Sequence, residues 1–175
     1  GIELTVSTDV SEMAWWPLPS HKLRLDLSYG YLYSRCESGC PLGSDGDELP
    51  FRPPNRFLPS LSYEYVPLAT ALQIWGEYED NAYAALPNDP PTPPGTDGNT
   101  VVAAHWLWSF KLSAQLDRLL WFLDQDGGVG PLLRYTNVFL EGQNVFDNRV
   151  EAPTLGQMGA VVSRRSFLAG VQFEL

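Results

Sequence analysis

The side chains that could carry chemistry are few and far apart in this sequence. The two histidines, His21 and His105, lie in different segments, and neither belongs to a recognisable nucleophile motif. A serine beside a histidine can form a hydrolase site, and Ser109 would share a face with His105 if both belong to one strand. A polar side chain in a wet interior explains His105 more simply. We therefore expect no catalytic residues and no enzyme activity.

The two cysteines, Cys36 and Cys40, enclose three residues within a polar stretch. Two cysteines at this spacing suit a small disulfide-closed loop in an oxidising compartment. A metal site would need further ligands nearby, and both histidines are distant in sequence. The run Asp124-Gln-Asp-Gly-Gly lacks the third acidic position and the distal Glu of a calcium loop, which favours a plain turn. The sequence predicts a Cys36–Cys40 disulfide, no metal and no cofactor.

The polar candidates are positioned by segments with a period of two residues. From His21 to Tyr33, Leu and Tyr occupy the odd positions, whereas mostly polar residues occupy the even ones. This alternation indicates a strand, because a helix would mix the two sets. The pattern recurs to give about seven strands, with residues 117–131 left open between a helix, a turn and an eighth strand. The other alternating segments are 1–10, 55–66, 71–80, 101–116, 133–146 and 162–175.

The polar side of these strands holds charged and aromatic side chains that could meet a ligand. Trp75 could stack on one, and paired charges such as Arg24 with Asp26, or Lys111 with Glu77, would build a network across an interior. The ligand-facing candidates are Arg24, Asp26, Trp75, Glu77, His105 and Lys111.

The apolar side of the strands is large and aromatic, as in Trp106, Trp108 and Phe110. A soluble sandwich would bury this side under a second sheet, whereas a transmembrane barrel would turn it towards lipid. The formal net charge of -10 argues against a nucleic-acid partner. Mean hydropathy is -0.16, and no apolar run reaches the roughly 18 residues of a membrane helix. The bulk of the apolar side favours a lipid-facing barrel sheet, and the soluble sandwich is the alternative.

The connections between strands alternate between short and long. Such alternation is typical of outer-membrane barrels, which have short turns on one side and long loops on the other. Five prolines between residues 81 and 99 exclude a helix or a central strand there. The long loops are residues 35–50, 80–99 and 147–161.

Several motifs at the predicted strand ends resemble those of a known family. Asn144-Val145-Phe146-Asp147, with Val for Leu, resembles the Asn-Leu-Phe-Asp motif that closes the penultimate strand of TonB-dependent outer-membrane receptors of Gram-negative bacteria. Residues 165–175 resemble the Arg-led final strand of the same family. Residues 50–56, Pro-Phe-Arg-Pro-Pro-Asn-Arg, resemble a family strand entry, and Gly1-Ile-Glu-Leu resembles a family strand opening. Two departures are Leu175 in place of a terminal aromatic residue, and Ser163-Arg164-Arg165 in place of Gly-Arg.

The resemblance implies a bacterial outer-membrane receptor that takes up a scarce nutrient, such as a ferric siderophore, another metal chelate, cobalamin or a glycan. It implies contacts with outer-membrane lipid and lipopolysaccharide, and with TonB through a plug domain that is not visible in this sequence. With the C-terminus on the periplasmic side, as in the family, the three long loops would face outward and capture the ligand.

Residues 1–175 are therefore expected to form one segment of a larger barrel. A receptor barrel has about 22 strands. Seven is an odd number of strands, which cannot close as an outer-membrane barrel. Gly1 opens directly into a strand pattern with no signal peptide, which suggests a mature form or a piece of something longer. The alternative is a small closed outer-membrane barrel with a structural, adhesive or hydrolase role. That alternative requires the last strand to pair with residues 1–10.

Overall fold

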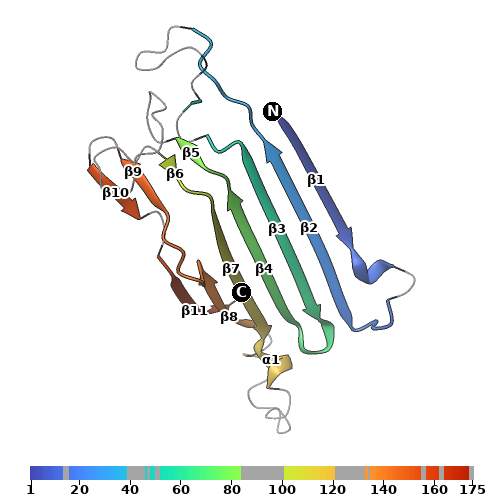
Figure 1. Ribbon diagram of the computed structural model, residues 1–175. Helices are drawn as coiled ribbons and strands as arrows, with labels where there is room; N and C mark the ends of the chain where they lie inside the picture. Colours follow the sequence, from blue (N-terminus) through green and yellow to red (C-terminus); the bar gives the residue numbers. More distant parts are fainter. Residues whose placement is uncertain are drawn as a thin grey trace.

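In a computed structural model, the chain forms one large antiparallel sheet and two small two-stranded sheets (Figure 1). The structure describes residues 1–13, 16–38, 46, 48–49, 52–83, 101–120, 133, 135–154, 157–161 and 164–173. The large sheet has seven strands, as the alternation predicts. In spatial order they are β1 (Ile2–Asp9), β2 (His21–Tyr31), β3 (Asn55–Tyr65), β4 (Thr70–Glu79), β7 (His105–Gln115), β8 (Thr136–Gln143) and β11 (Ser166–Phe173).

The strands of the large sheet pair in the order in which they follow one another along the chain. The small strands that lie between them in sequence belong to the two small sheets. The lower end, in the orientation of Figure 1, carries η1 (Val10–Glu12), η2 (Val66–Leu68) and α1 (Leu116–Leu119). The upper end carries the long connections, which hold the hairpins β5 (Ala82–Tyr83) with β6 (Val101–Val102), and β9 (Glu151–Thr154) with β10 (Gln157–Val161). The sheet is thus an up-and-down meander with its long connections on one side.

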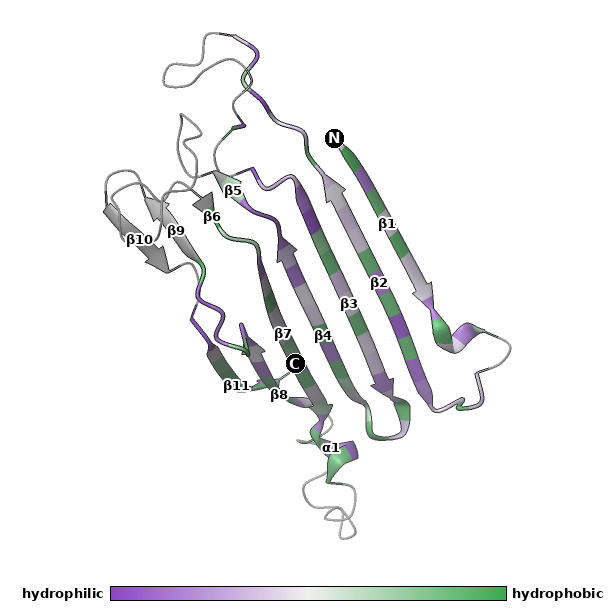
Figure 2. Ribbon diagram, in the orientation of Figure 1, coloured by the Kyte–Doolittle hydropathy of each residue, from purple (hydrophilic) through white to green (hydrophobic). Residues whose placement is uncertain are grey.

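The strand register gives the sheet one apolar and one polar face. An apolar row crosses six strands because its members are direct cross-strand partners: Leu25, Leu61, Ile74, Phe110, Gly142 and Phe167. One residue along each strand, a polar row crosses the opposite face: Asp9, Arg24, Ser62, Gln73, Lys111 and Glu141. Figure 2 shows the resulting alternation along β1, β2 and β3. Aligned rows follow from a ladder without slips, since a shift by one residue would exchange the two faces.

No second layer covers the apolar face in the part of the chain that the structure describes. Large side chains in the middle of this face remain exposed, among them Leu61, Leu112 and Leu140. No described side chain of any size is completely buried. Among the described residues there is therefore no second sheet over Trp106, Trp108 and Phe110, which the soluble sandwich requires. None of the described helices has the length and apolarity to cross a membrane.

Two segments differ from the sequence prediction, and a third is one that the prediction left open. The segment 101–116 is interrupted at residues 103–104, so that β6 belongs to a small sheet and only β7 to the large one. The predicted loop 147–161 contains the β9–β10 hairpin, whose Pro and Gly obscure the strand pattern. Residues 116–119 form a short helix, whereas residues 121–132 lie outside the described part.

The edges of the large sheet are β1 and β11, and in the described residues these two strands do not pair. The small closed barrel required that pairing. In the described part of the chain both edges are open, with backbone groups that a spanning sheet must satisfy.

Candidate functional site on the polar face

The six ligand-facing candidates all lie on the polar face, on β2, β4 and β7. The predicted pair on β2 is formed, with Arg24 Nε 3.1 Å from Asp26 Oδ1. Arg24 also donates to Ser7 Oγ on β1 at 2.9 Å, and the Ser7 hydroxyl donates to Asp26. This triad joins two neighbouring strands through charge-assisted hydrogen bonds.

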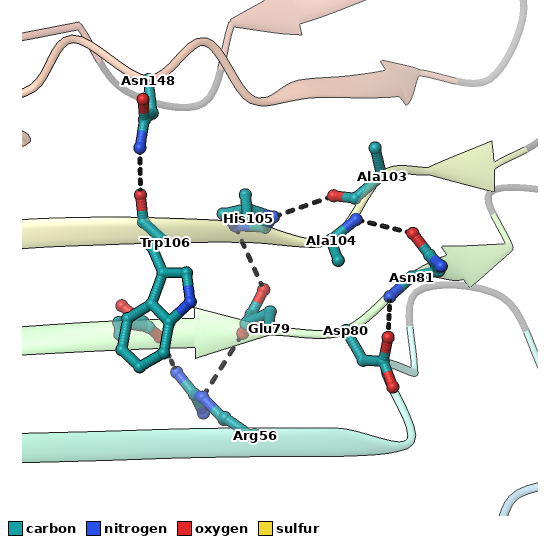
Figure 3. Close-up of polar contacts among 10 residues, drawn as sticks. Arg56, Glu79, Asp80, Asn81, Ala103, Ala104, His105, Trp106 and Asn148 are labelled. Carbon is teal, nitrogen blue, oxygen red and sulfur yellow. Dashed lines mark hydrogen bonds and ion pairs between the residues drawn. The ribbon is translucent and has the colours of Figure 1, made fainter.

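A second network, which we call the upper polar cluster, consists of Arg56, Glu77, Glu79 and His105 and links β3, β4 and β7 (Figure 3). Arg56 donates to Glu77, and its Nε lies 3.3 Å from Glu79 Oε1. His105 Nε2 lies 3.8 Å from Glu79 Oε2, and the side chain of His105 is only 13% exposed. A single carboxylate, Glu79, therefore holds a guanidinium on one side and an imidazole on the other.

The predicted pair between Lys111 and Glu77 does not form. The register places Glu77 opposite Leu107, and Lys111 opposite Gln73 and Glu141. Glu77 pairs with Arg56 instead. Lys111 Nζ lies 5.3 Å from the ring centroid of Phe139, within range of a cation–π contact.

Arg24 and Lys111 border a hollow of about 430 Å³ near the lower end of the polar face. Between these two cations the floor is made of small or neutral residues, Ser62, Ala71 and Gln73. The register places the neutral side chains of Ser62 and Gln73 between Arg24 and Lys111 in one cross-strand row. Lys22 and Glu64 also line the hollow and pair at 3.2 Å. Such a surface can accept polar or anionic groups from water.

Trp75 and His105 lie on the polar face, on the neighbouring strands β4 and β7. Trp75 lies between Ser60 and Ser109 in the register and is half-buried. In the described part of the chain, no hydrogen bond joins His105 to Ser109, and His105 Nδ1 lies 3.1 Å from the carbonyl oxygen of Ala103. No group of three or more metal-ligating side chains was found among the described residues.

Cys36 is disulfide-bonded and 4% exposed. Its predicted partner, Cys40, lies outside the described residues. The surrounding loop leaves the sheet through a ladder in which Leu32 N–H donates to Pro54 O at 2.8 Å. Arg35 and Glu48 continue it as an isolated bridge.

The Asn144–Asp147 motif forms a turn directly after β8. Asn144 and Asp147 adopt left-handed backbone conformations, with φ of 45° and 55°. Asn144 is 2% exposed; its side chain accepts from Asn148 N–H at 3.0 Å and donates to Asn148 O at 2.9 Å. Asn is one of the few residues that tolerates this conformation and can bond its own turn.

The same turn joins three strands. Val145 N–H donates to Trp108 O at 2.9 Å, and Asn148 Nδ2 donates to Trp106 O at 2.6 Å, both on β7. Asp147 Oδ1 accepts from the backbone N–H of Arg165, just before β11, at 3.2 Å. Phe146 remains 69% exposed. The motif residues thus fix where β8 ends and where β11 begins.

Sequence reasoning missed Arg56 and Glu79 as members of a site, although both fall on the polar side of their strands. The signal that could have found them was the tight β3–β4 connection, because it sets the register of the two strands. Tyr65 and Thr70 are the paired residues nearest to this turn. Counting back from that pair places Arg56 opposite Glu79. The cluster could therefore have been predicted from the register of the strands, but not from residue type alone.

No protein-family model matches this sequence. No curated protein matches it either. Among solved structures, the chain is similar to the closed form of the ferric-catecholate import receptor Fiu from E. coli K12. The sheet resembles part of an import receptor. The match covers 97% of this chain and 20% of Fiu, with a TM-score of 0.63 and 14% sequence identity. At this identity the likeness concerns the fold, and the chain spans about a fifth of the length of Fiu.

Proposed function

We propose that this chain is a wall segment of a TonB-dependent receptor in a bacterial outer membrane, which takes up a scarce nutrient such as a ferric siderophore or cobalamin. The observation that carries the proposal is the two-faced, open-edged sheet, in a chain of which 97% aligns with part of an import receptor. The turn at Asn144–Asp147 and the strand after Arg165 supply independent support, because they resemble the closing motifs of the receptor family.

The distribution of aromatic residues on the apolar face supports a place in a membrane. One band, near the upper end, contains Phe57, Tyr78 and Trp106, with Trp106 stacked on Trp108 at 5.4 Å between ring centroids. A second band near the lower end contains Tyr63 and Tyr65, which pack around His21. Two aromatic bands separated by aliphatic rows are the arrangement that membrane barrels present to the two interfaces.

In the proposed orientation the upper end faces outward. The long connections 32–54, 80–104 and 144–165 would then meet the nutrient ligand and lipopolysaccharide, and the polar face would line the barrel interior. A plug outside this chain would contact that face and, through TonB, be displaced by energy relayed from the inner membrane. The open edges of β1 and β11 would pair with the remaining barrel strands, which would satisfy their backbone groups.

Uptake by the full-length protein tests this proposal. The protein would be produced in a Gram-negative host that lacks its own ferric-catecholate and cobalamin receptors, with TonB either present or deleted. Radiolabelled ferric catecholate and cobalamin would be supplied in separate experiments. We expect the protein in the outer-membrane fraction, and uptake of one ligand only when TonB is present.

Two results would contradict the proposal at different levels. Recovery of the folded protein in a soluble fraction would refute the membrane assignment. Correct insertion with uptake that is unaffected by deletion of TonB would retain the barrel and refute the energised receptor.

A further inference from the structure

Three cations border the hollow of about 430 Å³ on the polar face, and two of them are already paired with carboxylates. Lys22 pairs with Glu64, and Arg24 pairs with Asp26. The third cation is Lys111, and among the described residues no carboxylate lies within ion-pair distance of its ammonium. The charge of Lys111 is therefore uncompensated in the described part of the chain.

The register gives Lys111 a carboxylate neighbour with which it does not pair. Glu141 is its direct cross-strand partner on β8. Glu141 Oε1 instead accepts from Gln143 Nε2 at 2.9 Å, towards the upper end of β8. The ammonium of Lys111 lies 5.3 Å from the ring centroid of Phe139, two residues from Glu141 in the other direction. The two charges are thus held by contacts towards opposite ends of β8.

The ring beneath Lys111 belongs to a small apolar patch on the otherwise polar face. Phe139 pairs with Gly170 on β11. A Cβ on Gly170 would lie 2.5 Å from Cζ and 2.7 Å from Cε1 of this ring, so the ring lies across β11 in space that only a glycine leaves. Leu168, two residues before Gly170 and on the same side of β11, is 59% exposed. We call Phe139, Gly170 and Leu168 the β8–β11 patch.

On the other side of Lys111, the hollow offers neutral hydrogen-bond donors. Gln73 is the cross-strand partner of Lys111 on β4, and Ser113 follows Lys111 by two residues on β7. Both line the hollow, as does Ser62. In the described part of the chain these three side chains make no hydrogen bond. A carboxylate only accepts hydrogen bonds, so amide and hydroxyl donors beside an ammonium suit it.

We propose that Lys111 is the centre of a binding site for a carboxylate carried on an apolar body. The carboxylate would lie in the hollow against Lys111, Gln73 and Ser113, and the apolar body against the β8–β11 patch. One uncompensated ammonium matches one negative charge, and covering the patch removes apolar surface from water. The carboxylate can come from a small molecule or from an acidic side chain beside an apolar one in a segment outside residues 1–175.

Binding of benzoate to the full-length protein in lipid vesicles tests the site. Benzamide has the same ring without the charge, and acetate has the charge without the ring. Transfer of NMR saturation from the protein to each probe measures binding, with empty vesicles as the background. We expect benzoate to bind more tightly than benzamide or acetate, and Lys111→Gln to weaken benzoate binding about three- to tenfold. Leu168→Asn should weaken the binding of benzoate but not that of acetate.

The matched control is Lys22→Gln. Lys22 lines the same hollow and is exposed like Lys111, but its partner is Glu64. Because solvent screens charges across an open surface, this variant should change benzoate affinity by less than about twofold. Urea unfolding reports whether each variant is folded.

The unfolding measurement also distinguishes the two sources of the carboxylate. If an acidic side chain of another segment fills the site, Lys111→Gln should destabilise the full-length protein more than Lys22→Gln does, and benzoate should not bind. If the site takes a small molecule, the two variants should unfold alike and benzoate should bind.

Two results would overturn the site. One is the absence of any Lys111-dependent binding of benzoate in a protein whose two lysine variants unfold alike. The other is binding of benzamide as tight as that of benzoate, because the charge would then play no part. Uptake with and without TonB is a separate readout, so this site can fail while the proposed receptor stands, and the reverse.

Discussion

The two faces of the sheet are built on the same backbone ladder but are stabilised differently. The apolar row through Leu61, Ile74 and Phe110 contains no polar group and is left uncovered by the described part of the chain. The polar face one residue away is joined across strands by ion pairs, including Lys22 with Glu64 and Arg56 with Glu79. The apolar face therefore depends on its surroundings, whereas the polar face carries its own cross-strand contacts.

Because of this difference, the stability of the sheet depends mainly on what covers its apolar face. An exposed apolar row gains nothing from water, and burying it is the main favourable term available to the sheet. The ion pairs of the polar face are more than a third exposed on at least one side and contribute little individually. The following substitutions test this ranking.

A charge in the middle of the apolar face should have the largest effect. Ile74→Lys places an ammonium in the apolar row. If this row faces lipid, as we propose, the substitution should destabilise the full-length protein by about 2–4 kcal/mol. Gln73→Lys, on the next residue but the opposite face, should cost less than about 0.5 kcal/mol. Urea unfolding of the protein in lipid vesicles measures both. Equal effects would show that the apolar face does not meet lipid.

Close packing at one glycine should come next. A Cβ on Gly142 would lie 2.5 Å from Phe110 Cε1 and 3.0 Å from Phe167 Cε1, so rings on both neighbouring strands must move. Gly142→Ala should destabilise the protein by about 1–3 kcal/mol. Gly30→Ala, which meets nothing within 4 Å, should be neutral or slightly stabilising. The same unfolding measurement would contradict the packing argument if the two variants behaved alike.

The β3–β4 turn should respond in the opposite direction. Ala69 has φ of 43° and ψ of 45°, a left-handed conformation that is strained for alanine. Ala69→Gly should stabilise the protein by about 0.5–1 kcal/mol, whereas Ala71→Gly, two residues later in β4, should destabilise it by a similar amount. Unfolding midpoints give the sign of each change. A loss of stability in Ala69→Gly would indicate that the turn is unstrained.

The smallest effect is expected on the polar face. The side chains of Lys22 and Glu64 are 57% and 43% exposed, so solvent screens their ion pair. Lys22→Met should change stability by less than about 0.5 kcal/mol. Repeating the unfolding in high salt sharpens the comparison, because salt screens the ion pair and should reduce the difference in unfolding free energy between the wild type and the variant. A cost above about 1 kcal/mol would place more stability on the polar face than we assign to it.

The alternation of apolar and polar residues was sufficient to predict the strands in which it runs without interruption. In β2, odd-numbered Leu and Tyr residues predicted both the strand and its apolar face. The pattern failed where Pro and Gly interrupt it, as in the β9–β10 hairpin around Pro153 and Gly159. It also could not separate β6 from β7, because residues 103–104 leave the ladder through tertiary contacts such as that between Ala104 and Asn81.

The candidate site was predicted in part. Residue type and alternation placed Arg24, Glu77 and His105 on the polar face, and the pairing of Arg24 with Asp26 followed from their spacing on one strand. The choice of Arg56 rather than Lys111 as the partner of Glu77 required the register between strands. Position along a strand is local information, whereas register depends on turns and ladders that join distant segments.

The sequence by itself determined that this chain has two-faced strands, because successive side chains in a strand point to opposite sides whatever the neighbours are. The tertiary structure decided which side chains meet across those strands, and with them the upper polar cluster and the turn at Asn144. It also placed β1 and β11 at opposite edges of one sheet, since the curvature and pairing that could join two ends belong to the whole ladder and to no single strand.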